Sequence, residues 1–597
     1  MARYAPSFQV IYLLRLINAL TLTTFFQPDE FFQSLEPAWN LAFGPESGAW
    51  LTWEWHHQLR SSLHPILFSA FYKAVTFICD LLPPSQNDSL RASALLSAPR
   101  VLQASIAAGG DYFTYRLASQ IYGPSSISAL AAIYLQLLSP WQWYVSTRTF
   151  SNSLETTLTV IALAYFPWSI FAKFPVETSD KTRAQQVAIN LPSLRISLSL
   201  AALAVVLRPT NLFIWTPIAL VALSRLSTGN ILILAREAVL CGSLVLGLSV
   251  LADRWFFGFW TFPPWLWLNF NVSKSLAVFY GRNPWHYYLL QGMPLLCTTS
   301  LPFTLQALWK PKGPGVDTTG HKLLTLQSFT WAIFTMIGIL SLISHKEVRF
   351  IYPLLPTLNV LAAPYVASFF TRTTKSAAQK SPTFTMRNMP YLFAALSINI
   401  VLAGYLSTLH QPAPLSVLHF LRNDFTRIHQ PPSILTPVGT SSSADSSATD
   451  ELFALFLMPC HSTPWRSHLI SPSLHARALT CEPPLHTHPN TPERDLYRDE
   501  ADRFYDAPLN FLTTELFSPS DPSSLKTLPR YIVGFEGIEP WLQEFADQTE
   551  VGKGLGLRLE KVWEGFNGFF NEDWRRAGRM VVWDTGRFRH GSLEKAF

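Results

Sequence analysis

The segment Phe25-Phe26-Gln27-Pro28-Asp29-Glu30 decides how the rest of the chain is interpreted, because it places two carboxylates directly after an apolar run over 8–26. Ionised side chains at the end of a membrane helix are costly to keep near hydrocarbon, so such a pair indicates a functional site. The alternative is structural, with Asp29 and Glu30 capping a short interfacial helix that Pro28 begins. Both interpretations stay open at this point.

The composition predicts a polytopic α-helical membrane protein. Only 14% of the 597 residues are charged, against about 25% in an average soluble chain, and 49% are hydrophobic. The run over 8–26 is long enough to span a membrane and is not followed by an A-x-A-like cleavage site. It is therefore expected to be an uncleaved signal anchor. The net charge of +6 and the lack of a basic run give no indication of nucleic acid. Further apolar runs lie at 63–83, 97–118, 125–142, 153–172, 192–207, 209–224, 231–252, 290–309, 323–343, 351–371 and 389–408.

The distribution of basic residues predicts the orientation of these runs. The basic stretches 310–322 and 372–387 favour the cytosol, which places 253–289, the His345 region and everything after about 410 on the lumenal side. The signal anchor places 27–62 on that side as well. Twelve full spans cannot satisfy both assignments, because an even number returns the chain to its starting side. About 11–13 transmembrane helices are therefore expected. Segment 97–142 is the first candidate for a run that does not span or for a span that is missing from this count.

Three regions follow from the change in character along the chain. We expect a transmembrane catalytic domain over 1–409 with lumenal loops 27–62 and 253–289, a linker over 410–450 with a Ser-rich segment, and a lumenal α/β domain over 451–597. Short apolar strands at 453–457, 530–535 and 580–583 and a helix at 540–547 support the α/β assignment. In an oxidising lumen, Cys460 and Cys481 can pair. Asn271 and Asn87 lie in possible glycosylation sequons.

A second polar segment, His345-Lys346-Glu347-Val348-Arg349, interrupts about 50 apolar residues. A short loop whose charges reach the membrane interface would explain it. Alternatively, Lys346 and Arg349 bind an anionic group such as a phosphate, and His345 hydrogen-bonds to it.

Three further segments carry polar residues at the ends of apolar runs. Segment 147–155 places Arg148 near Asn152 and Glu155, and its Ser and Asn residues are typical of a helix start. Arg148 and Glu155 either pair with each other or line a polar cavity. Arg208 lies inside apolar sequence beside Pro209, where a snorkelling side chain is the plain interpretation. The aromatic loop 280–288 includes Trp285 and His286, and it serves either as an interfacial belt or as a lid.

These motifs together resemble the lipid-linked-sugar-dependent mannosyltransferases of the endoplasmic reticulum, in the GT-C superfamily, family 22. The marks are P-D-E-x-x-Q-x-x-E at 28–36, R-T-x-S-N-x-x-E at 148–155 and H-K-E-x-R-F-x-Y-P at 345–353. The stretches that resemble the members acting on GPI-anchor precursors are 51–55, 253–258, 279–286, 458–464 and 499–510. The resemblance covers roughly residues 10–540.

The resemblance implies transfer of the third mannose of the GPI anchor, in α1,2 linkage, from dolichyl phosphate mannose to a two-mannose glycolipid acceptor in the ER membrane. Asp29 is expected to be the general base, with Glu30 as the alternative. His345, Lys346, Arg349 and Arg148 are expected to bind the donor phosphate, with no cofactor and no metal. Other residues expected at the site, for substrate or structure, are Gln33, Glu36, Trp53, Glu54, Trp55, Asn152, Glu155, Glu347, Trp285 and His286.

Two rival functions remain. A sister enzyme of GPI or N-glycan assembly would use the same donor, although segment 458–464 argues against it. A transporter or a non-catalytic scaffold would place its charges deep inside several helices, whereas here they gather near the ends of apolar runs.

Overall fold

The computed structural model describes residues 5–82, 87–172, 189–272, 281–315, 320–374, 383–429, 452–485, 487–488, 491–518, 524–525 and 527–587. The chain forms two compact units. The first contains Met1–Leu20, His57–His64 and Arg100–Gly404, and the second contains Thr21–His56, Pro65–Pro99 and Tyr405–Phe597. The Ser-rich segment 441–450 lies outside the described residues.

Helices build the first unit, together with one β-hairpin. Its helices are α1 (Phe8–Thr21), the main part of α5 (Asn87–Tyr122), α6 (Ile127–Leu137), α7 (Pro140–Val145), α8 (Ser151–Tyr165), α9 (Leu191–Leu207), α10 (Leu212–Arg225), α11 (Thr228–Phe257), α12 (Pro263–Val272), α13 (Met293–Cys297), α14 (Leu301–Trp309), α15 (His321–Leu342), α16 (Leu355–Phe370) and α17 (Met389–Thr408). Strands β1 (Thr371–Thr374) and β2 (Thr383–Met386) pair antiparallel.

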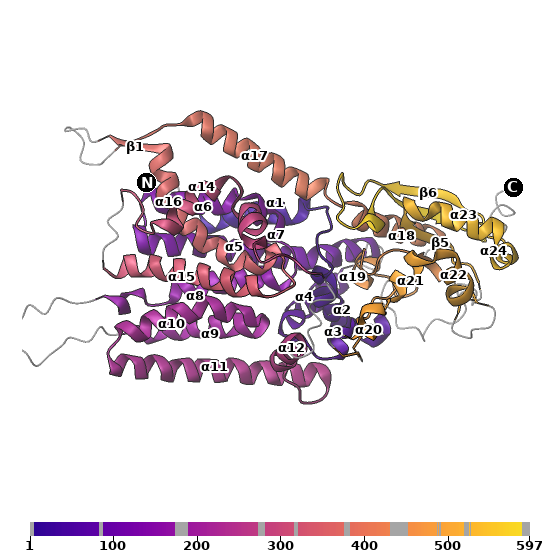
Figure 1. Ribbon diagram of the computed structural model, residues 1–597, viewed down its shortest axis with the longest axis horizontal. Coiled ribbons are helices and arrows are strands. Elements are labelled where there is room, and N and C mark those ends of the chain that lie inside the picture. The colour runs from indigo at the N-terminus through magenta and orange to yellow at the C-terminus, as the bar shows by residue number, and fades with distance from the viewer. Residues whose placement is uncertain are drawn as a thin grey trace, which may run out of the picture. The chain divides into compact units, whose positions relative to one another are not determined.

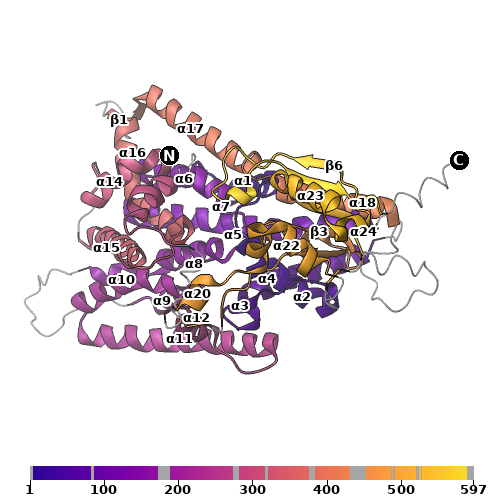
Figure 2. The same ribbon diagram turned by 45° about the vertical axis from the view of Figure 1, so that its right-hand side comes forward.

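The helices of this unit pack in successive layers. Helix α9 packs against α8 and α11, while α10 packs against α15. Figures 1 and 2 both show α8, α9 and α11 following one another across the unit. Helix α16 is almost entirely buried, whereas α11 exposes large apolar side chains such as Leu232, Val239 and Leu244. An apolar helix face of this kind suits a lipid environment.

Among the described residues, four helical stretches are long and apolar enough to cross a membrane. They are Thr228–Phe257, His321–Leu342, Val348–Phe370 and Met389–His429. The expected run 97–118 lies within the 36-residue helix α5, whereas several other expected runs form shorter helices. The run 125–142, for example, is broken where Ser139 accepts a hydrogen bond from the N–H of Gln142 and Pro140 starts α7. The expected 11–13 spans stay a prediction.

A buried ion pair lies inside the first unit. Arg15 Nε lies 2.6 Å from Asp111 Oδ2, and both side chains are fully buried. Gln142 donates to the other carboxylate oxygen at 2.8 Å, and the Tyr352 hydroxyl donates to Gln142 at 2.6 Å. This network ties α1, α5 and α7 to the segment that precedes α16.

The second unit contains the N-terminal loop segments and the α/β region. Its helices are α2 (Glu36–Phe43), α3 (Trp53–His56), the main part of α4 (Leu63–Asp80), α18 (Ala413–His429), α19 (Arg466–Leu469), α20 (Pro492–Leu496), α21 (Glu500–Asp506), α22 (Pro508–Phe511), α23 (Glu539–Gln548) and α24 (Glu550–Leu555). Its strands are β3 (Leu452–Phe456), β4 (His475–Ala478), β5 (Tyr531–Phe535), β6 (Glu560–Gly565) and β7 (Met580–Asp584).

The five strands form one mixed sheet in the order β4-β3-β5-β7-β6. Strand β3 runs parallel to β4 and β5, and β7 runs antiparallel to β5 and β6. Side chains alternate between the two faces with period two. Phe453 and Tyr531 contact aromatic rings of α18, while Ile532 and Trp583 join the core that contains α21 and α23.

The three strands and the helix expected at 540–547 are confirmed, and so is the α/β character of this region. Strands β4 and β6 were not predicted from the sequence. Asn87 begins α5, and Asn271 lies in α12.

Candidate active site

The segment His345–Arg349 forms an ion cluster held together by Glu347. Arg349 donates to both carboxylate oxygens of Glu347, through Nε at 2.6 Å and Nη2 at 2.7 Å. His345 Nε2 lies 3.0 Å from Oε1 of the same carboxylate. Burial raises the pKa of Glu347, but the charges and hydrogen bonds of Arg349 and His345 outweigh it, and the net pKa lies below the usual range. Glu347 therefore carries a negative charge that orients the Arg349 guanidinium.

Lys346 ties this cluster to the aromatic loop. Its side chain is buried, and Nζ donates to the main-chain carbonyls of Asn283 at 2.9 Å and Ile343 at 2.5 Å. Asn283 donates in return to the carbonyls of Lys346, at 2.8 Å, and Ser344, at 2.9 Å. Burial lowers the pKa of Lys346. One Nζ hydrogen bond therefore holds the aromatic loop against the ion cluster, and the other holds the segment that precedes the cluster.

The segment 148–155 reaches the cluster through Asn152. Asn152 Nδ2 donates to the carbonyl of Arg349 at 3.1 Å. Arg148 is buried, donates to the carbonyl of Tyr144 at 2.9 Å, and has its guanidinium 4.4 Å from the centre of the Tyr144 ring. The sequence suggested that Arg148 and Glu155 pair, yet the structure gives Glu155 another cation.

That cation is Arg208, whose Nε lies 3.5 Å from Glu155 Oε2. Asn211 donates to Glu155 Oε1 at 2.9 Å. Arg208 lies at the end of α9, and its guanidinium is 5.4 Å from the centre of the Phe350 ring. The Arg349 guanidinium is 5.7 Å from the same ring. Arg208 therefore belongs beside the ion cluster, and its only sequence signal was an arginine at a break in apolar sequence.

In the second unit, Asp29 and Glu30 differ in exposure. Glu30 is buried at 9% exposure, whereas Asp29 is partly exposed. Glu30 makes no side-chain capping hydrogen bond to the helical turn Phe31–Leu35 that follows it. Glu30 therefore does not cap that turn through its side chain. Nearby, Gln33 donates to Glu54 at 2.9 Å.

His461, which is not among the predicted site residues, lies near Asp29. The ring of His461 is 4.1 Å from that of Phe32 and 4.9 Å from that of Trp50, centre to centre. Burial lowers the pKa of His461 to about 4, an effect that the charge of Asp29 opposes. The imidazole is therefore neutral near pH 7. Its only sequence signal was its place in segment 458–464.

A disulfide joins Cys460 to Cys481, with their Cα atoms 5.7 Å apart. It fixes the chain next to His461, whose Nδ1 is 3.2 Å from the Cys460 sulfur. These three residues do not form a metal site here, because the disulfide consumes both thiols.

Glu36 has a structural position in this unit. It is fully buried and accepts hydrogen bonds from the backbone N–H groups of Trp50, at 3.1 Å, and Ser467, at 2.8 Å. Burial raises the pKa of Glu36, while these hydrogen bonds and the nearby Arg466 lower it. Glu36 therefore links the loop at Trp50 to helix α19.

The tryptophans and the remaining histidine of the predicted site have different environments. Trp55 is buried, and its Nε1 donates to the carbonyl of Phe32 at 2.9 Å, so its role is structural. Trp53 and His286 are half-buried, and Trp285 is 69% exposed. Trp285 is therefore available to lipid or sugar.

Comparison with known proteins defines the class of this chain. The model of the Alg9-like mannosyltransferase family matches residues 7–470, so the chain belongs to this family and is a glycosyltransferase of family 22. The expected family is thereby confirmed.

Two named proteins and one solved structure are similar to this chain over most of its length. A protein of Gibberella zeae named GPI mannosyltransferase 3 is 58% identical, over 96% of this chain and 94% of that protein. A protein of Danio rerio named GPI alpha-1,2-mannosyltransferase 3 is 33% identical, over 91% of this chain and 84% of that protein. The crystal structure of ArnT from Cupriavidus metallidurans bound to undecaprenyl phosphate aligns with a TM-score of 0.49 and 11% identity, over 97% of both chains.

Proposed function

We propose that this chain adds the third mannose of the GPI anchor, in α1,2 linkage, to a two-mannose precursor, with dolichyl phosphate mannose as donor. The observation that carries the proposal is the 58% identity, over nearly the full length, to a protein named GPI mannosyltransferase 3. The reaction takes place at the lumenal face of the ER membrane, in a GT-C-type multi-span domain over 1–409. Residues 451–597 form a lumenal C-terminal domain.

Asp29 is the proposed general base. The donor is a β-linked phosphate and the product is α-linked, so the anomeric carbon inverts in one displacement. The acceptor hydroxyl loses its proton to Asp29 as its oxygen bonds to the anomeric carbon, and the phosphate leaves with the electrons of the broken C–O bond. No general acid is needed, unlike in inverting glycoside hydrolysis. The greater exposure of Asp29 supports this choice over the buried Glu30.

Arg349, Lys346, His345 and Arg148 are proposed to bind the donor phosphate. A leaving phosphate gains negative charge, and fixed cations in a dry site stabilise that charge. The bidentate contact with Glu347 supports the role of Arg349, because it holds the guanidinium in one orientation.

The test combines a cell-based and a variant experiment. Cells that lack this chain should accumulate a GPI precursor with two mannoses, identified by mass spectrometry. Asp29→Asn at normal protein abundance should slow transfer by about 10²–10⁴-fold, the usual contribution of a general base. Glu30→Gln is the matched control and should keep near-normal activity.

Each rival function predicts a different outcome. Accumulation of a lipid-linked N-glycan precursor would identify a sister enzyme instead. Normal mannose transfer in both variants would refute the base assignment. Normal function of Asp29→Asn in cells, together with no mannose transfer by the purified chain, would favour a transporter or a scaffold.

A further inference from the structure

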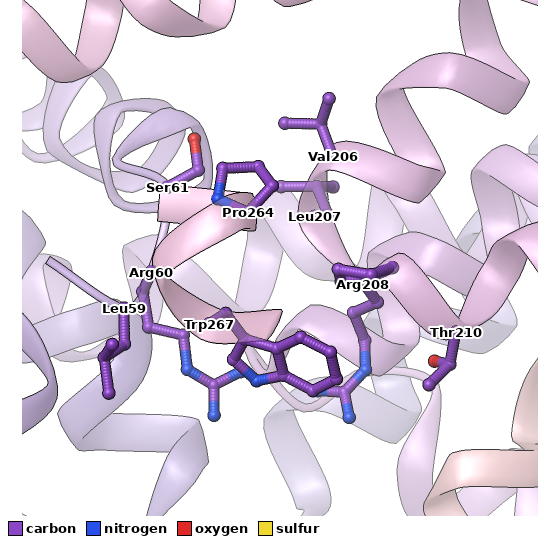
Figure 3. Close-up of a pocket in the computed structure, with 10 residues that line it drawn as sticks. Leu59, Arg60, Ser61, Val206, Leu207, Arg208, Thr210, Pro264 and Trp267 are labelled. Atoms are coloured by element: carbon purple, nitrogen blue, oxygen red, sulfur yellow. The ribbon is translucent and has the colours of Figure 1, made fainter. Parts of the chain in front are cut away.

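A small cavity in the first unit brings together two arginines from separate segments. Arg60 comes from the loop before α4, and Arg208 from the end of α9, while Trp267 of α12 forms part of the wall. Figure 3 shows both arginine side chains extending past the indole of Trp267 in the same direction. The residues that line the cavity include these two cations and no carboxylate.

The size of the cavity limits what it can hold. Its volume is about 30 Å³, and one water needs at least about 10–15 Å³ on the same measure. The space therefore takes two or three water-sized atoms, which excludes a mannose ring and matches the oxygens of one phosphoryl group. Guanidinium groups are the protein donors best suited to phosphoryl oxygens, because their N–H groups form a planar fork.

The loop that carries Arg60 is fixed by a buried carboxylate. Asp253 of α11 is fully buried and accepts hydrogen bonds from Ser62 N, at 2.6 Å, and Ser62 Oγ, at 2.7 Å. Ser61 Oγ donates to the same carboxylate at 3.2 Å. A buried carboxylate is stable only when it is well supplied with such donors. Asp253 is thus a positioning residue for Arg60.

Arg208 is likewise held in place, and it links the cavity to the ion cluster. Its Nη1 donates to Ser151 Oγ at 3.2 Å, and its guanidinium lies against the Phe350 ring, which Arg349 also contacts. Glu155 balances part of the Arg208 charge. Arg60 brings a second guanidinium to the same cavity.

We propose that Arg60 and Arg208 form an anion site that binds the phosphoryl group of a polyprenyl-phosphate lipid. The site adds two cations to those already proposed for the donor phosphate. The lipid class rests on the proposed function, whereas the anion site itself rests on the cavity.

The test measures binding without catalysis. The purified full-length chain in detergent is titrated with a short-chain polyprenyl phosphate, with the uncharged polyprenol and with inorganic phosphate, and thermal stabilisation reports binding. The polyprenyl phosphate should stabilise the protein and the polyprenol should not. Arg60→Gln and Arg208→Gln should each weaken polyprenyl phosphate binding by at least tenfold. Arg225→Gln, an exposed arginine in the last turn of α10, is the control and should bind normally.

Two further variants separate binding from folding. Arg60→Lys keeps the charge and should recover part of the affinity. Asp253→Asn alone should weaken polyprenyl phosphate binding, because Asp253 positions Arg60. Combined with Arg60→Gln, it should cause no further loss of affinity. Additive losses would refute the positioning role.

The outcomes also separate this inference from the proposed function. Wild-type binding by both glutamine variants would overturn the anion site, whatever the enzyme activity. Stabilisation by inorganic phosphate equal to that by the lipid phosphate would overturn the lipid assignment. A third outcome is that the wild-type chain binds polyprenyl phosphate but transfers no mannose, while both glutamine variants lose the binding. This outcome would support the anion site and refute the proposed function.

Discussion

Replacing Glu347 by glutamine removes the carboxylate that holds the ion cluster together. Arg349 is 6% exposed and Glu347 19% exposed, and the two contacts between them measure 2.6 and 2.7 Å. Breaking a buried pair costs about 3–5 kcal/mol, because it leaves an unpaired charge. The partial exposure of Glu347 reduces this loss, so we expect Glu347→Gln to destabilise the protein by about 3 kcal/mol.

A double-mutant cycle tests whether the loss comes from the pair. Arg349→Met alone leaves the Glu347 charge without its main partner, whereas the double variant leaves neither charge. The double variant should therefore lose less stability than the sum of the single variants, by more than about 1 kcal/mol. Thermal unfolding of the purified full-length variants in detergent measures this. Additive losses would refute the pairing argument.

The same carboxylate gives a pH dependence. The pKa of Glu347 in the folded protein lies below its ordinary value of 4.5, because Arg349 and His345 outweigh the effect of burial. Its stabilising contribution is therefore present above about pH 4.5 and is lost as the pH falls further. Glu347→Gln should flatten this part of the stability profile, and an unchanged acid profile would contradict the assignment.

Four other substitutions have clear expected outcomes. Cys460→Ser or Cys481→Ser should cost about 3 kcal/mol, because the disulfide closes a loop with a separation of 21 residues. The two variants should unfold alike, and a reductant should shift only the wild type. Asp111→Asn should cost about 3–5 kcal/mol by leaving Arg15 buried without its counter-charge, seen as lower abundance and a lower unfolding midpoint. Arg503→Gln breaks an exposed pair and should cost below about 1 kcal/mol. If Asp111→Asn and Arg503→Gln reduced the free energy of unfolding by similar amounts, the argument that burial makes the Arg15–Asp111 pair costly to break would be refuted.

The strands of the second unit show what the sequence could reveal about the fold. The predicted strands β3, β5 and β7 occupy the three central positions of the sheet, where both faces are covered and the residues are apolar. The missed strands β4 and β6 are the two edges. Edge strands carry more polar residues and pair on one side only. Segments such as Glu560–Gly565 therefore give no continuous apolar signal.

The candidate site shows the same division between local and distant information. Residues 345–349 could be selected together because they interrupt a long apolar stretch. The partners of Glu155 could not, because Arg208 and Asn211 lie more than 50 residues away along the chain. An arginine beside a proline in apolar sequence is typical of a snorkelling side chain. Only the fold places Arg208 beside Phe350.

The neutral state of His461 bears on the choice of Asp29 as the base. A protonated imidazole near a carboxylate would stabilise the carboxylate and lower its proton affinity. Burial against Phe32 and Trp50 keeps the pKa of His461 at about 4, so no such charge exists near pH 7. The disulfide at Cys460 fixes the chain at the adjacent residue. Segment 458–464 therefore places an uncharged imidazole, and not an imidazolium, near the proposed base.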